Sequence, residues 1–138
     1  MTNRQIVIAE IPEATLTPEH FKLIETPMPT PGDGEVLLRV ILMSIDAANR
    51  SWMKGATYRA AVNAGDPMPT YAICEVVASK SPKFSAGDIV AAEATWADHI
   101  TAPAHRVMKL PVLETLSHHM SVYGIAGKTA YHGLMTIG

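Results

Sequence analysis

The strongest constraint on the fold is a series of short aliphatic and β-branched runs separated by Pro, Gly, Asn and Asp. Such runs predict strands, here at 4–9, 20–25, 35–44, 71–79, 88–93, 96–101 and 105–108. The clearest boundary precedes the third run, where Pro31 fixes φ and Gly32 and Gly34 tolerate positive φ, so the chain can turn sharply into a long strand. Several strands at this spacing favour a barrel-like β domain. We therefore predict a mainly β fold, a partly open barrel.

The pattern changes after Pro111, because apolar positions between 122 and 137 recur every three to four residues. This period predicts helices at the C-terminal end. Thr115 or Ser117 could cap the first helix, and Gly124 and Gly127 are expected to divide the segment into two. The stretch 51–70 has neither period and is rich in small residues, so we expect a long loop, the usual location of binding residues.

Composition narrows the functional classes. The chain has 138 residues, 48% of them hydrophobic, which is enough apolar material for one core, and its formal charge of −2 leaves no basic surface for nucleic acid. No apolar run is long enough to span a bilayer, and the first residues do not form a secretory core. A single cysteine cannot form an internal disulfide. We expect a soluble, cytoplasmic protein that binds neither nucleic acid nor membranes.

Motifs for metal or nucleotide binding are incomplete. One cysteine cannot supply a structural zinc site, and the adjacent His118 and His119 point to different faces of a helix, so we expect no metal site. The segment 124–129, GIAGKT, lacks the first glycine of a phosphate-binding loop, because Val122 stands there. No GxGxxG follows a predicted strand. Cys74 is interpreted as a small buried residue and Asp88 as a turn residue before a strand.

Several short motifs nevertheless stand in a recognisable order and spacing. They are PGDGEVL at 31–37, Ser44-Ile45-Asp46 with Arg50, Glu75-Val76-Val77, Gly87-Asp88-Ile89-Val90, Trp96 and Gly127-Lys128-Thr129-Ala130-Tyr131. In this order they resemble the medium-chain dehydrogenase/reductase superfamily. The nearest resemblance is to its zinc-free, NADPH-dependent double-bond reductases, the prostaglandin reductase, leukotriene B4 dehydrogenase and curcumin reductase group. Zinc-binding members carry a cysteine where Ser44 stands and a His-Glu pair where Cys74-Glu75 stands.

The resemblance implies that residues 1–138 form a GroES-like, substrate-side N-terminal domain whose C-terminal helices lead toward a Rossmann domain absent from this chain. It implies NADPH as cofactor and reduction of the C=C bond of an α,β-unsaturated ketone or aldehyde. Thr129, with a helix starting near it, Ile125 and Ala48 would lie beside the cofactor, and Asn49, Trp52 and Tyr58 beside the substrate. No catalytic residue is assigned. Without the cofactor-binding half, a fragment or truncated product of this length is expected to be inactive.

The chain departs from the group at several of these positions. Ala48 replaces an expected tyrosine, Ala47 and Asn49 replace a proline and a methionine, and His99 replaces a second aromatic residue. Two alternatives therefore stay open: a stand-alone GroES-like binding or oligomerisation module, or a fragment of a quinone or enoyl-thioester reductase. A homo-oligomer is possible under each. The apolar residues of the 51–70 segment, Trp52 and Tyr58 among them, suit a pocket for a small enone, enal or quinone better than a polar loop for a protein partner.

Overall fold

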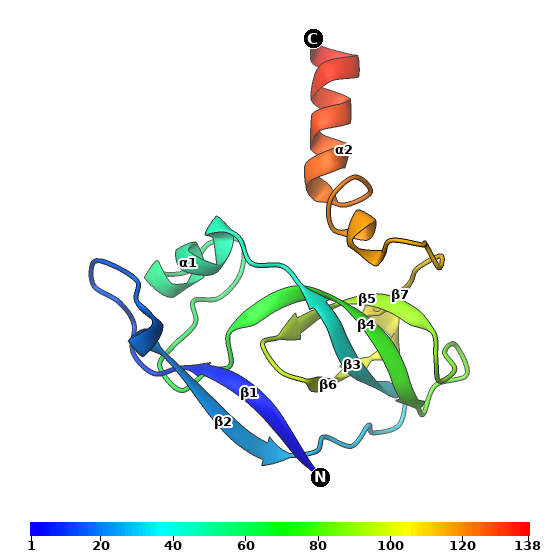
Figure 1. The fold of residues 1–138 in the computed structure, drawn as a ribbon, viewed down its shortest axis with the longest axis horizontal. Coiled ribbons are helices and arrows are strands. Elements are labelled where there is room, and N and C mark those ends of the chain that lie inside the picture. The colour runs from blue at the N-terminus through cyan, green and yellow to red at the C-terminus, as the bar shows by residue number, and fades with distance from the viewer.

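The computed structural model describes residues 1–138 and contains seven strands and several short helices (Figure 1). The strands are β1 Thr2–Ile8, β2 Phe21–Pro27, β3 Glu35–Met43, β4 Pro69–Ser79, β5 Ile89–Thr95, β6 His99–Pro103 and β7 Met108–Lys109. A 3₁₀ turn at Pro18–His20 precedes β2, and another at Ala104–Arg106 precedes β7. The prediction of a mainly β domain is confirmed.

The seven strands form two separate antiparallel sheets. β1 pairs with β2, and the other five form a sheet in the order β6-β3-β4-β5-β7. The two sheets meet where the Ile6 N–H donates to the Trp96 carbonyl at 2.7 Å and the Asp98 N–H donates to the Arg4 carbonyl at 3.0 Å. These bonds connect β1 to the segment before β6 without closing the sheets into a continuous barrel. The result is the expected partly open barrel.

The first five predicted strands agree with the structure to within about two residues at each end. The last two predictions need correction. The run predicted at 96–101 begins at His99, because the Trp96 N–H donates to the Met68 carbonyl at 2.8 Å and so still extends the pairing of β5 with β4. Half of the run predicted at 105–108 belongs to the 3₁₀ turn Ala104–Arg106, in which the Ala104 N–H donates to the Gly34 carbonyl at 2.9 Å, and the strand is only Met108–Lys109.

Helix α1, Ala47–Lys54, replaces the beginning of the loop predicted at 51–70. Asp46 is its N-cap, with its carboxylate accepting from the Ala48 N–H at 2.7 Å, while the Asn49 side-chain carbonyl accepts from the Asp46 N–H at 2.8 Å. This reciprocal capping satisfies backbone donors that a helix start leaves free. Gly55, at φ +154°, ends the helix. The loop prediction is therefore wrong for residues 51–54, and also for 69–70, where β4 has already begun.

The C-terminal segment has two helical parts, as predicted. A 3₁₀ turn at Leu116–His119 comes first, and α2, Ile125–His132, continues into a π-helical turn at Gly133–Ile137. Gly124 caps α2, but Gly127 lies inside it, and Thr115 stands at the cap of the 3₁₀ turn without a side-chain capping bond. Figure 1 shows α2 projecting away from the sheets. None of the helices combines the length and apolar character that crossing a membrane requires.

The larger core cluster lies within the five-stranded sheet, where β3, β4 and β5 contribute fully buried side chains such as Leu38, Cys74 and Val90. Cys74 is inaccessible, as predicted, and burial raises the pKa of its thiol to about 12. Asp88 is the expected turn residue, since its carboxylate accepts from the Ser85 N–H at 3.0 Å just before β5. A second cluster joins Ile8, Trp52, Met53 and Met68, and so packs α1 against β1.

Candidate functional site

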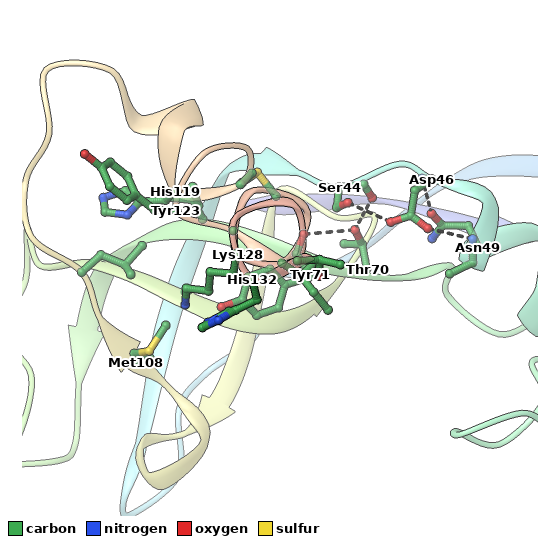
Figure 2. A pocket seen from close by; sticks show the side chains of 18 of the residues that line it. Ser44, Asp46, Asn49, Thr70, Tyr71, Met108, His119, Tyr123, Lys128 and His132 are labelled. Atoms are coloured by element: carbon green, nitrogen blue, oxygen red, sulfur yellow. Dashed lines mark hydrogen bonds between the residues drawn. The ribbon is translucent and has the colours of Figure 1, made fainter. Parts of the chain in front are cut away.

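A large cavity of about 1120 Å³ lies between the five-stranded sheet, α1 and the C-terminal segment (Figure 2). The sheet contributes Tyr71 and Ile73 from β4 and Ala91 from β5. The opposite wall comes from the segment after β7 and from α2, including Ile125 and Lys128. A cavity of this size with a mostly apolar lining is typical of a small-molecule site.

All six residues singled out in the sequence line this one cavity. They are Ala48, Asn49, Trp52, Tyr58, Ile125 and Thr129. Four of them come from α1 and the loop that follows it, and two come from α2, so the cavity joins parts of the chain that lie far apart in sequence. Their roles in binding cofactor or substrate stay predictions.

The amide of Asn49 is occupied by structural hydrogen bonds. Its Nδ2 donates to the Pro69 carbonyl at 2.9 Å, and its Oδ1 accepts from the Asp46 N–H. The side chain is buried, at 7% exposure. Asn49 thus connects the start of α1 to the start of β4. Because both polar atoms of its amide already have partners, its role at the cavity is to hold the wall in place rather than to bind a ligand by hydrogen bonds.

Trp52 and Tyr58 form an aromatic corner of the cavity. Trp52 is buried, and Tyr58, with 82% of its surface exposed, meets it edge-on at a centroid distance of 6.1 Å. The Arg59 guanidinium lies 4.7 Å from the centroid of the Trp52 ring, a cation–π arrangement. The Trp52 Nε1 is buried without a hydrogen-bond partner. The two rings thus give this corner an aromatic surface, and the exposed Tyr58 adds a hydroxyl group to it.

Ala48, Ile125 and Thr129 add small or apolar surface. Ala48 contributes only a methyl group, which packs against the cluster around Trp52. Ile125 is 84% exposed at the first position of α2. The helix start expected near Thr129 is wrong, since α2 begins at Ile125 and Thr129 lies one turn inside it. Thr129 therefore offers its hydroxyl rather than the free N–H groups of a helix start.

Sequence reasoning missed two polar residues on the sheet side of the cavity, Thr70 and Tyr71, which lie there beside Ser44. The Ser44 hydroxyl donates to the Asp46 carboxylate at 3.2 Å, and the Thr70 hydroxyl donates to the Ser44 carbonyl at 2.5 Å. Tyr71 is 43% exposed, and its hydroxyl makes no hydrogen bond. The period of two along β4 places Tyr71 and Ile73 on one face, but the sequence does not say which face of the strand lines the cavity.

The ionisable groups are divided between the two walls. Lys128 and His132 project from α2, one turn apart, while Asp46 is the lining carboxylate of the other side. His119 also lines the cavity, with its Nε2 2.9 Å from the Pro111 carbonyl oxygen. Nowhere does the structure bring together three His, Cys, Asp or Glu side chains in a way that could hold a metal ion. The cavity is therefore apolar, with positive charge on its α2 side.

Known proteins resemble this chain along its whole length. Residues 4–110 match the family described as the N-terminal domain of oxidoreductase. The NADPH-dependent curcumin reductase of Escherichia coli is 35% identical over 99% of this chain and 40% of that protein, and the mouse prostaglandin reductase 1 is 34% identical over 88% and 36%.

Two solved structures of CurA from Vibrio vulnificus superpose on the chain. Each has a TM-score of 0.86, with 34% and 33% identity, and each comparison covers 96% of this chain and 40% of CurA; the second structure is of CurA in complex with NADPH. The chain spans about two fifths of the length of these relatives.

Proposed function

This chain belongs to the family of N-terminal domains of oxidoreductases, within the medium-chain dehydrogenase/reductase superfamily, and from that membership we propose that it is the substrate-side domain of an NADPH-dependent double-bond reductase. Its GroES-like fold is the one predicted for residues 1–138, and CurA shares it. The proposed substrates are α,β-unsaturated ketones or aldehydes. The observation that carries the proposal is the single cavity onto which all six predicted site residues open.

The cavity suits one end of NADPH. Ala48, Ile125 and Gly124 give a small and apolar surface against which a flat nicotinamide ring can pack. Phosphate groups need several cations or a glycine-rich loop, and Lys128 is the one Lys or Arg side chain on the lining. We therefore assign the nicotinamide end to this chain and the phosphates to a nucleotide-binding domain elsewhere in a longer protein. The 138 residues alone are expected to be inactive.

When bound, NADPH supplies the hydride that adds to the β-carbon of the enone, leaving an enolate whose α-carbon takes a proton from the solvent. The chain's own share is to bind and orient. Trp52 and Tyr58 offer aromatic surface for an extended conjugated substrate, which the apolar lining of the cavity can help to orient. The Thr129 hydroxyl on α2 is available as a hydrogen-bond donor.

The test is to join residues 1–138 to the remaining, cofactor-binding part of the E. coli curcumin reductase and follow NADPH absorbance at 340 nm. We expect the fusion to consume NADPH with 4-phenyl-3-buten-2-one, in a one-to-one ratio with the saturated ketone found by mass spectrometry. The 138-residue chain alone and the curcumin reductase part alone are the controls and are expected to be inactive.

Quantitative NADPH binding and a cooperative thermal transition would first establish that the fusion is folded. A folded, NADPH-binding fusion that reduces menadione but no enone would refute the proposal in favour of a quinone reductase. One that reduces neither would favour the stand-alone binding module. Light scattering of the same sample reports whether the protein forms a homo-oligomer.

A further inference from the structure

We propose that the hydroxyl of Tyr71 binds the carbonyl oxygen of the substrate and stabilises the negative charge that develops there during reduction. This inference deepens the proposed function and rests on it. It assigns a catalytic residue to a site for which sequence analysis assigned none. The argument comes from how Tyr71 is held, from which other polar groups are already engaged, and from the charge around it.

The backbone of Tyr71 is fixed near the start of β4, the central strand of the five-stranded sheet. β4 has β3 on one side and β5 on the other, and Tyr71 stands opposite Glu93 of β5. Its carbonyl oxygen accepts from the Ser44 N–H at 2.9 Å and from the Thr70 hydroxyl at 3.2 Å. A donor on a central strand keeps its position without reorganisation when the charge appears, which is what electrostatic stabilisation of a transition state requires.

The other polar side chains on this side of the cavity already have partners. The Ser44 hydroxyl donates to Asp46, and the Thr70 hydroxyl donates to backbone carbonyl oxygens. The Asn49 amide bridges α1 and β4. The Tyr71 hydroxyl has none, although the tyrosine is more than half buried and lines the cavity. It is therefore the free donor of the sheet wall, carried by a backbone that is hydrogen-bonded within the sheet.

Two other tyrosines also line the cavity but are held less firmly. Tyr58 lies in the loop after α1, with 82% of its surface exposed, and Tyr123 lies before α2, with 58% exposed. Ala48, on α1 at the same cavity, contributes only a methyl group. Neither loop tyrosine has the strand-held backbone that fixes Tyr71.

The electrostatic setting favours a neutral phenol that donates to an anion. Burial raises the pKa of Tyr71 above its ordinary value, so the hydroxyl keeps its proton at neutral pH. Lys128 and His132 line the same cavity from α2, on the wall opposite the sheet (Figure 2). A hydrogen bond from a hydroxyl to an oxyanion is short and strong, and positive charge on the facing wall adds to it.

The first experiment measures an enolate analogue on the 138-residue chain itself. The probe is 4-hydroxycoumarin, which is an anion at neutral pH, and binding is followed by calorimetry and by NMR of tyrosine labelled with ¹³C at Cζ. We expect Tyr71→Phe to weaken binding about 10- to 100-fold, the loss expected for a hydrogen bond to a charged group, and the Tyr71 Cζ signal to shift with probe in the wild type.

Tyr131→Phe is the matched control, because Tyr131 is 62% exposed on α2 and does not line the cavity. It should bind the probe as the wild type does. The inference is overturned if Tyr71→Phe, with an unchanged thermal transition, binds the probe as tightly as the wild type, or if the wild type does not bind it.

The second experiment uses the fusion with the curcumin reductase part. There Tyr71→Phe should lower kcat by a similar factor while KM changes little, since the bond is made mainly in the transition state. An active fusion whose kcat survives Tyr71→Phe would overturn the role of Tyr71 and leave the proposed function standing. A folded but inactive fusion would refute the proposed reductase function. If the isolated chain still bound the probe through Tyr71, the role of Tyr71 in binding an oxyanion would stand.

Discussion

Replacing Asn49 with alanine removes the side chain that joins α1 to β4 beside the cavity. The Asp46 N–H loses its partner but is near solvent, so its loss costs about 0.5–1 kcal/mol. Pro69 is buried, and its carbonyl oxygen loses the Asn49 Nδ2 donor at 2.9 Å, which costs about 1–3 kcal/mol. The free energy of unfolding should fall by about 1.5–4 kcal/mol, and Tm by roughly 5–14 °C for a domain of this size.

The assay is urea unfolding followed by tryptophan fluorescence, for which Trp52, one turn from Asn49 on α1, is a local reporter. Asn63→Ala is the matched control, because the Asn63 amide donates to the Asp66 carboxylate at 3.3 Å in an exposed turn. Its effect should stay within about 0.5 kcal/mol. A loss below about 1 kcal/mol for Asn49→Ala, or one no larger than for Asn63→Ala, would refute the view that this amide holds the cavity wall in place.

Other perturbations test the thiol, the acid response and the start of α2. Burial raises the pKa of Cys74 to about 12 in the folded protein, whereas the unfolded thiol has a pKa of about 8.5 and ionises first. Urea midpoints should therefore fall as pH rises from about 8.5 toward 12, and Cys74→Ala should make that slope shallower. Lys109 holds the pKa of Asp88 below its usual range, so the stability that Asp88 contributes is present above about pH 4 and lost on acidification; urea midpoints between pH 3 and 7 should show a shallower acid slope for Asp88→Asn. A Cβ on Gly127 would come within 2.0 Å of a backbone oxygen, whereas one on Gly133 meets nothing within 4 Å; hydrogen exchange should therefore show α2 opened by Gly127→Ala, and Gly133→Ala should leave it intact or stabilise it by about 0.5–1 kcal/mol.

The strands could be predicted because their boundaries are local. Pro31 and Gly34 stop one segment and start β3 at Glu35, and Asp88 does the same for β5 at Ile89. Helix α1 was missed because it is short and its apolar side chains, Trp52 and Met53, come only in its second turn. The capping pair of Asp46 with a polar side chain three residues later was the signal that could have revealed it.

The residues of the site were likewise predictable where sequence motifs mark them, and not where their position depends on long-range strand pairing. Resemblance to the reductase group identified residues of α1 and α2, such as Trp52 and Thr129, and the structure brings them to one cavity. Tyr71 could not be singled out, because a tyrosine in a strand is equally consistent with either face of the sheet until the pairing register is known. That register, which pairs Tyr71 with Glu93, depends on contacts that no local window of sequence contains.

Helix α2 faces the rest of the protein only where it lines the cavity, opposite the five-stranded sheet. All of its residues except Gly127 are exposed, and the structure has no hydrogen bond between residues 125–137 and the strands. A ligand that touches both Tyr71 and Thr129 would therefore connect α2 and the five-stranded sheet, which otherwise have few contacts with each other. Its observed affinity is its contact energy minus the entropy of immobilising the helix, so a ligand too short to reach α2 would bind the sheet wall without this cost and leave the helix as free as before.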